Sequence, residues 1–159
     1  MPLSLFRVDD RLVHGQVVIG WGRPLAARFI VLVDNEVRES NWEQDLYRMA
    51  VPDGVEIIFA STAEAIARLP EWSADSRPGI LLTADLATMA ALHDALPALV
   101  RRVNLGGLHH RPGRVERLRY IYLAAGDEVL LRRLGREGTE IIAQDLPTAA
   151  AVDLKTLLR

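Results

Sequence analysis

Short, almost continuously apolar segments recur along this chain of 159 residues, and they constrain its fold more than any other feature. Such segments are typical of strands that are buried on both faces of a sheet. We expect strands at residues 3–8, 29–33, 55–60, 80–83, 103–105, 120–123 and 141–143. The stretches between them have helical patterns, at residues 16–27, 42–50, 62–69, 86–96, 127–134 and 148–158. The alternation predicts an α/β fold with an open, mainly parallel β-sheet of about seven strands and helices on both faces.

Turn and capping residues agree with this division of the chain. Ser61 followed by Glu64 predicts a capping box at the start of a helix. Pro-Asp-Gly at residues 52–54 predicts a turn, and the polar stretch 71–77 predicts a surface loop. No repeat or low-complexity segment divides the sequence, so we expect residues 1–159 to form one domain.

Composition and charge argue against several classes of function. The formal net charge is only -2, so no positive field favours nucleic acid. There is no cysteine, which excludes disulfides and thiolate-bound metals and fits a reducing compartment. The N-terminus reaches Arg7 too early for a secretion signal, and no apolar run approaches the roughly 20 residues of a membrane helix. We therefore expect a cytoplasmic protein that binds no nucleic acid.

The loop expected after the first strand has the most reactive groups. Residues 7–18 are Arg-Val-Asp-Asp-Arg-Leu-Val-His-Gly-Gln-Val-Val. Ligands of open α/β sheets bind outside the carboxyl ends of the strands, and the N–H groups that open a helix favour an anion. The sequence therefore predicts an anion site beside a histidine, two carboxylates and an arginine.

His14 is the candidate catalytic residue. Its neutral imidazole is a nucleophile, and the ordinary pKa of about 6.5 leaves that form dominant near neutrality. Asp9 and Asp10 are both candidates for the carboxylate that orients the ring, with Asp9 slightly favoured, although either could instead cap the helix. A structural histidine beside a surface ion pair is the alternative that these residues leave open.

Other residues are candidates for stabilising a phosphoryl group. The planar guanidinium of Arg11 suits two phosphoryl oxygens, and the Gly15 backbone can approach a phosphate closely because it lacks a Cβ. Gln16 supplies an amide donor or a capping group. Gly106 and Gly107 follow another expected strand and are placed in an adjacent loop, although paired glycines most often mark turns.

Two features further along the chain have less specific patterns. His109 and His110 lack the spacing of a zinc pair and have no acidic ligand cluster beside them, so we expect no metal. A basic stretch follows, and we expect it to contact a partner only if it lies beside His14. Its members are Arg111, Arg114, Arg117 and Arg119.

Residues 7–17 closely resemble the active-site motif of the mannose/sorbose family of IIB components of sugar phosphotransferase systems. Further resemblance lies in Trp21 and in residues 31–34, 49–50 and 103–107, which follow in the order of that family and span most of the chain. The resemblance implies the mainly parallel α/β fold that the strand pattern also predicts. Members of the family commonly have a methionine-containing segment after the two glycines, and this chain departs from that pattern.

The same resemblance implies a phosphotransferase. In the family, the histidine that matches His14 accepts a phosphoryl group from a IIA phosphohistidine and passes it to a sugar brought by membrane IIC and IID subunits. The resemblance implies phosphorylation at the ring Nδ1 and a contact of Arg11 with the phosphoryl group or the IIA partner. It also implies a location at the cytoplasmic side of the membrane permease, and no cofactor.

Alternative functions remain open at this level. One is a regulatory histidine-phosphoprotein of the same fold, and another is a phosphatase or mutase that forms a phosphohistidine. A dinucleotide-dependent oxidoreductase is disfavoured, because no Gly-x-Gly-x-x-Gly follows the first strand. The identity of the sugar and the oligomeric state, including a homo-oligomer, also stay open.

Overall fold

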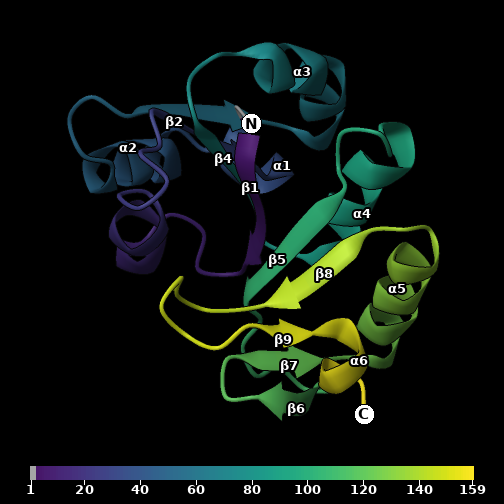
Figure 1. The fold of residues 1–159 in the computed structure, drawn as a ribbon. Coiled ribbons are helices and arrows are strands. Elements are labelled where there is room, and N and C mark those ends of the chain that lie inside the picture. Colours follow the sequence, from purple (N-terminus) through teal and green to yellow (C-terminus); the bar gives the residue numbers. More distant parts are fainter. Residues whose placement is uncertain (1–2) are drawn as a thin grey trace.

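A seven-stranded sheet forms the centre of the computed structural model, which describes residues 3–159 (Figure 1). The strand order is β3-β2-β4-β1-β5-β8-β9, and all neighbours are parallel except β8 and β9. The strands are β1 Leu3–Asp9, β2 Phe29–Val33, β3 Glu56–Ala60, β4 Gly79–Thr83, β5 Arg102–Gly107, β8 Glu140–Ala143 and β9 Val152–Asp153. The structure confirms the predicted open, mainly parallel α/β sheet.

Helices surround the sheet on both faces (Figure 1). They are the short π-helix η1 Gln16–Trp21, α1 Asn35–Arg38, α2 Asn41–Ala50, α3 Thr62–Ala74, α4 Leu86–Ala95, α5 Ala125–Arg136 and α6 Leu154–Leu157. Within residues 3–159, no helix is long and apolar enough to cross a membrane.

The two faces of the sheet explain why its strands are continuously apolar. Along β2, Phe29, Val31 and Val33 belong to one buried cluster, which also contains the buried apolar side chains of α3, α4 and α5. Ile30 and Leu32 belong to the other cluster, which contains the buried side chains of η1 and α1. Alternate side chains point to opposite faces of a strand, so a sheet covered on both sides needs apolar residues at every position.

The C-terminal region differs from the prediction. The predicted strand 120–123 is shortened to β7 (Ile121–Leu123), and it pairs with β6 (Val115–Leu118) in a separate antiparallel hairpin. The seventh place in the sheet belongs to β9, which is antiparallel to β8. The predicted helix 148–158 is wrong, because the Asp153 side chain accepts the Thr156 N–H and α6 begins only at Leu154.

Two more predictions differ in extent. The predicted helix 16–27 ends at Trp21, where Gly22 and Pro24 follow and the chain continues in turns. The predicted surface loop 71–77 is wrong over its first half, since α3 continues to Ala74 and buries Trp72 in the core. The capping box of Ser61 and Glu64 is confirmed at the start of α3.

The connections around β1 and β5 place a topological switch point between these neighbouring strands. The chain leaves β1 for η1, which packs on one face of the sheet, and it leaves β5 for the hairpin and α5, which packs on the other. Open α/β sheets bind ligands outside the carboxyl ends of strands at such a point. The loop that follows Asp9 lies there.

Candidate active site

Asp9, the last residue of β1, is the centre of the site. Its side chain is fully buried, and its Oδ2 lies 3.0 Å from each of Arg7 Nη2, Arg11 Nη2 and His14 Nε2. Its Oδ1 accepts the Arg11 backbone N–H at 3.0 Å and Arg11 Nε at 3.1 Å. Burial by itself would raise the pKa of the Asp9 carboxyl, but the hydrogen bonds from His14 and Arg11 and the charge of Arg7 together hold it well below its usual range. The carboxylate is therefore ionised at neutral pH.

Arg7 supports Asp9 from inside the protein. Its guanidinium, fully buried, donates to Asp9, to Asn104 Oδ1 at 2.7 Å, and to the backbone oxygens of residues 144 and 145 at 3.1 Å each. It also lies 5.4 Å from the centre of the Trp21 ring. Burial lowers the pKa of Arg7, and Asp9 opposes that shift, so the guanidinium keeps its charge.

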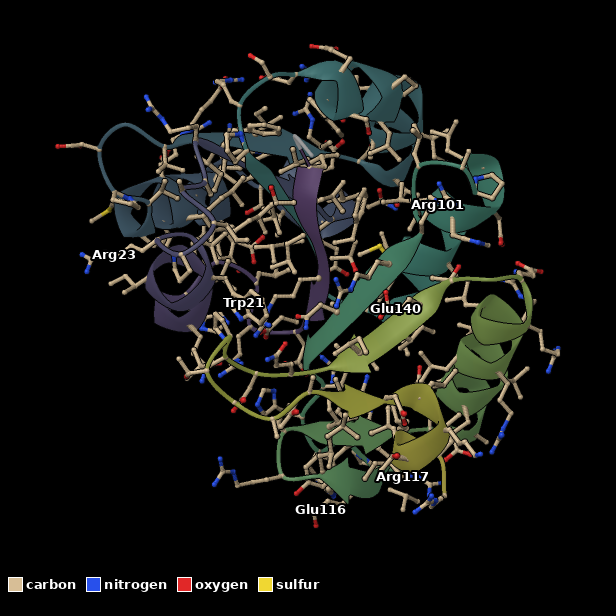
Figure 2. All side chains as sticks on the ribbon, in the orientation of Figure 1. Trp21, Arg23, Arg101, Glu116, Arg117 and Glu140 are labelled. Atoms are coloured by element: carbon tan, nitrogen blue, oxygen red, sulfur yellow. The ribbon has the colours of Figure 1, made fainter. Side chains whose placement is uncertain are left out.

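Trp21, at the end of η1, is the aromatic neighbour of this buried group (Figure 2). Its Nε1–H donates to the backbone oxygen of Asp145 at 2.8 Å, while its ring contributes to the apolar cluster under η1. The neighbouring Arg23 points outward from the same segment (Figure 2). Trp21 therefore ties the segment after β8 to the segment that carries His14.

The backbone between Asp9 and His14 folds back tightly. The Leu12 N–H donates to the Asp9 carbonyl at 3.0 Å, and Leu12 has a φ of 58°, in the left-handed region that non-glycine residues rarely adopt. Leu12 and Val13 bury their side chains in the core under η1. These buried anchors position the His14 backbone, whose carbonyl accepts the N–H groups of Val17 and Val18.

The contact with Asp9 determines which ring nitrogen of His14 has a free lone pair. An ionised carboxylate can only accept a hydrogen bond, so Nε2 carries the proton and Nδ1 holds the lone pair. The side chain is about one-fifth exposed, and among residues 3–159 no hydrogen-bond partner of Nδ1 is found. His14 therefore has a nucleophilic nitrogen that protein groups do not occupy.

Arg11 and Gln16 lie beside this ring. Arg11 Nη2 donates to Gln16 Oε1 at 2.8 Å as well as to Asp9, and the arginine side chain is about one-third exposed. Within the described residues, no acceptor is found for Arg11 Nη1 or for the backbone N–H groups of Gly15 and Gln16. These groups can donate to an anion that approaches His14.

The family model of the sorbose subfamily IIB component of the phosphotransferase system matches residues 3–159. The chain belongs to this family. The predicted resemblance is therefore confirmed, and as a IIB component the protein is a phosphotransferase of a sugar phosphotransferase system.

Two relatives match over nearly their full length. The N-acetylgalactosamine-specific phosphotransferase enzyme IIB component 2 of Escherichia coli K12 is 32% identical, over 99% of this chain and 100% of the relative. The sorbose-specific EIIB component of Lacticaseibacillus casei is 26% identical, over 97% and 93%. The crystal structure of the IIBSor domain of the Klebsiella pneumoniae sorbose permease has a TM-score of 0.89 at 23% identity, over 99% and 96%, so it shares the fold.

Asp10 does not contact His14 in this IIB component. Its side chain instead binds His109, through the backbone N–H at 2.8 Å and the ring Nδ1 at 2.6 Å. Of the two carboxylates that the sequence left open, the one that touches the His14 ring is Asp9.

Gly106 and Gly107 were expected in a loop, but they are the last two residues of β5. The strand extends this far because Gly107 pairs with Asp9, and its carbonyl accepts the Asp10 N–H at 3.0 Å. A Cβ at residue 106 would lie 1.9 Å from Arg7 Cζ. Glycine is thus required at 106 so that the β5 backbone can approach the buried guanidinium.

Arg7 is a site residue that was not predicted, although the sequence contains a signal for it. A charged residue inside an otherwise apolar strand, two positions before Asp9, lies on the same side of the strand as that carboxylate. Such a residue is expected to be buried with its partner. The other partners, Asn104 and residues 144–145, are distant in the chain and were not predicted as site residues.

A separate group of potential metal ligands lies between α4 and α5. The His93 Nδ1 is 3.3 Å from Asp94 Oδ1 and 3.6 Å from Glu137 Oε2. Arg133 Nη1 already contacts both carboxylates, at 2.7 and 3.2 Å, so these residues form an ion-pair network that joins the two helices. These residues are not part of the site around His14.

Proposed function

We propose that this IIB component accepts a phosphoryl group on His14 from a IIA phosphohistidine and passes it to a sugar that membrane IIC and IID subunits bring. The observation that carries the proposal is the 3.0 Å contact between Asp9 Oδ2 and His14 Nε2, which leaves the Nδ1 lone pair free on a partly exposed ring. The family and the fold agree with this role. We also propose that the chain acts as one domain in the cytoplasm, at the permease.

The proposed transfer begins with attack of His14 Nδ1 on the phosphorus. As the new P–N bond forms, the P–N bond to the donor imidazole breaks, and its electron pair returns to the donor nitrogen. His14 then bears both the phosphoryl group and the Nε2 proton, so its ring is positively charged. The ionised, buried Asp9 stabilises that charge at hydrogen-bond distance.

The equatorial oxygens need donors rather than covalent help, because phosphoryl transfer depends mainly on in-line positioning and on stabilisation of charge. In this proposal Arg11 Nη1 and the N–H groups of Gly15 and Gln16 supply these donors. Gln16 Oε1 and Asp9 hold the guanidinium in place, which reduces the reorganisation needed when the phosphoryl group arrives.

In the second half of the proposed cycle, His14 gives the phosphoryl group to the sugar. A sugar hydroxyl oxygen attacks the phosphorus, the P–N bond to His14 breaks, and its electron pair returns to Nδ1. The hydroxyl proton leaves to a base. The restored neutral ring keeps its Nε2–H bond to Asp9 and is ready for the next phosphoryl group.

The names of relatives support the proposed partners. Sorbose-specific and N-acetylgalactosamine-specific IIB components match this chain over most of its length. The PTS system mannose-specific EIIAB component of Escherichia coli K12 matches it over only 49% of that relative's length, which leaves room there for a further domain. A IIA domain is thus a fitting donor for this IIB component.

The test is phosphorylation by a panel of phosphorylated IIA proteins. We expect wild-type chain to gain one acid-labile phosphoryl group and His14→Ala to gain none. His110→Ala is the matched control, since His110 is exposed and its ring packs against Tyr122 rather than Asp9. Equal labelling of His14→Ala and wild type would refute the proposal.

A further inference from the structure

A second aspartate–histidine pair lies beside the site. The Asp10 side chain is almost buried, and its two oxygens hold both the backbone N–H and the ring Nδ1 of His109. Arg114 fixes the same segment, because its Nη1 donates to the His109 carbonyl at 2.8 Å and lies 3.9 Å from Asp10 Oδ2. His109 is thus held in one orientation by the residue that follows Asp9.

The Asp10 contact also determines which nitrogen of His109 is free. The carboxylate accepts from Nδ1 at 2.6 Å, so Nδ1 carries a proton and Nε2 is left without a partner among residues 3–159. The side chain is 44% exposed, which leaves Nε2 accessible to a ligand. The pair mirrors Asp9 and His14, with the opposite ring nitrogen held by the carboxylate.

The surroundings of Gly107 show that the His109 ring lies near Asp9 and Arg11. The point where a Cβ of residue 107 would lie is 3.0 Å from Asp9 Oδ1, 3.1 Å from Arg11 Nη2 and 3.2 Å from His109 Cε1. The Cε1 atom joins the two ring nitrogens of a histidine. His109 Cε1 and Arg11 Nη2 both lie within 3.2 Å of this point, so the two side chains face the same space above Gly107.

We infer that His109 is a second phosphoryl-binding residue, whose protonated Nε2 donates to an oxygen of the phosphoryl group carried by His14. The inference rests on the proposed function of His14. The phosphoryl group has nearly two negative charges, and it attracts the imidazolium form. In the neutral form Nε2 has a lone pair that would repel the phosphoryl oxygens, so a proton from solvent joins the ring when the phosphoryl group arrives.

The charged groups that face this ring act on its protonation in opposite directions. Asp10 binds Nδ1 directly and balances the positive charge of the imidazolium. Arg11 and Arg114 oppose that positive charge until the phosphoryl group arrives, and both then attract the phosphoryl oxygens as the imidazolium does, while the Asp9 carboxylate lies beside Arg11. With a phosphoryl dianion present, the ring lies between two anions, one on each nitrogen.

Two substitutions separate phosphoryl binding from a merely structural role. In His109→Asn the side-chain amide lies near the original Nδ1, so it can keep the Asp10 contact but has no group at the Nε2 position. In His109→Gln the longer side chain places its amide N–H₂ near the original Nε2. Thermal unfolding of both variants checks that they fold like wild type.

Phosphoramidate serves as the phosphoryl donor, because so small a molecule needs no docking surface. We expect His109→Asn to label His14 about 10- to 100-fold more slowly than wild type, the range for a lost hydrogen bond to a charged group. His109→Gln should recover most of that rate. Equal rates for the two variants and wild type would overturn the inference.

An NMR measurement on wild type gives an independent readout. We expect the ¹⁵N shift of His109 Nε2 to change from an unprotonated to a protonated value on phosphorylation, while His110 does not change. An unchanged Nε2 signal in the phosphorylated protein would overturn the inference even if a substitution altered the fold.

The His14→Ala variant distinguishes this inference from the proposed function. If His14→Ala takes up no label and the His109 variants match wild type, only the role of His109 fails. If His14→Ala takes up the same label as wild type, the acceptor role of His14 fails, and the inference fails with it.

Discussion

Replacement of Gly106 by alanine tests the buried support of the site. The new Cβ would lie 1.9 Å from Arg7 Cζ, 2.2 Å from Nη2 and 2.3 Å from Nε. Carbon atoms in contact lie about 3.5–4 Å apart, so the guanidinium or the β5 backbone has to move by roughly 1.5 Å. Arg7 cannot swing into solvent, because its side chain is fully buried.

The structure gives the magnitude of the effect. A shift of that size breaks the contacts of Arg7 with Asp9 and Asn104, now 3.0 and 2.7 Å. Disrupting a buried ion pair costs about 3–5 kcal/mol, out of a total stability of about 5–15 kcal/mol. For a chain of this length, each kcal/mol lowers Tm by about 2–4 °C, so we expect a fall of roughly 6–20 °C.

Urea unfolding followed by circular dichroism measures the free energy of unfolding of Gly106→Ala. Gly126→Ala is the matched control, because a Cβ there meets no atom within 4 Å and the residue lies in α5. The control should be unchanged or more stable by up to about 1 kcal/mol. A Gly106→Ala protein within about 1 kcal/mol of wild type would refute the reasoning about Arg7.

Three further predictions concern the site and the fold. The folded-state pKa of Asp9 lies well below its ordinary 3.8, so the ionised form stabilises the fold at neutral pH and this contribution is lost as pH falls below about 4. Asp9→Asn should therefore be less stable than wild type at pH 7 but lose less stability between pH 4 and pH 2. Urea unfolding at several pH values measures this, and an equal fall in the free energy of unfolding of the two proteins over that range would contradict it. Arg11→Lys should slow labelling of His14 by about 10- to 100-fold, because a lysine held by Asp9 has no second nitrogen with which to donate to the phosphoryl oxygens, and an unchanged single-turnover rate would contradict it. Ser61→Ala should destabilise the protein by about 1 kcal/mol through loss of the α3 cap and leave His14 labelling intact, as urea unfolding and a labelling assay can check.

The sheet could be predicted from the sequence because burial on both faces leaves a strong local signal. The strand Phe29–Val33 matches its predicted bounds, since each of its side chains is buried. By contrast, β9 has only two residues, and it forms because β8 offers an edge to pair with. A pairing of that kind depends on tertiary structure, which local periodicity does not report.

The site shows the same contrast. Asp9, Arg11 and His14 lie in one short loop, so their meeting could be predicted from the sequence. Asn104 comes from β5, and its contact with Arg7 exists only because the sheet brings β1 and β5 together. Which aspartate contacts which histidine depends on how the loop after Asp9 folds back. The residue pattern does not indicate that conformation.

The central claim is that His14 carries the phosphoryl group on the ring nitrogen that Asp9 leaves free. Phosphorus–proton correlation NMR of the phosphorylated protein distinguishes the two ring positions, and peptide mapping identifies the residue. We predict one phosphoryl group on His14 Nδ1, with a protonated Nε2 still bound to Asp9. A phosphoryl group on Nε2, or on any residue other than His14, would contradict the account.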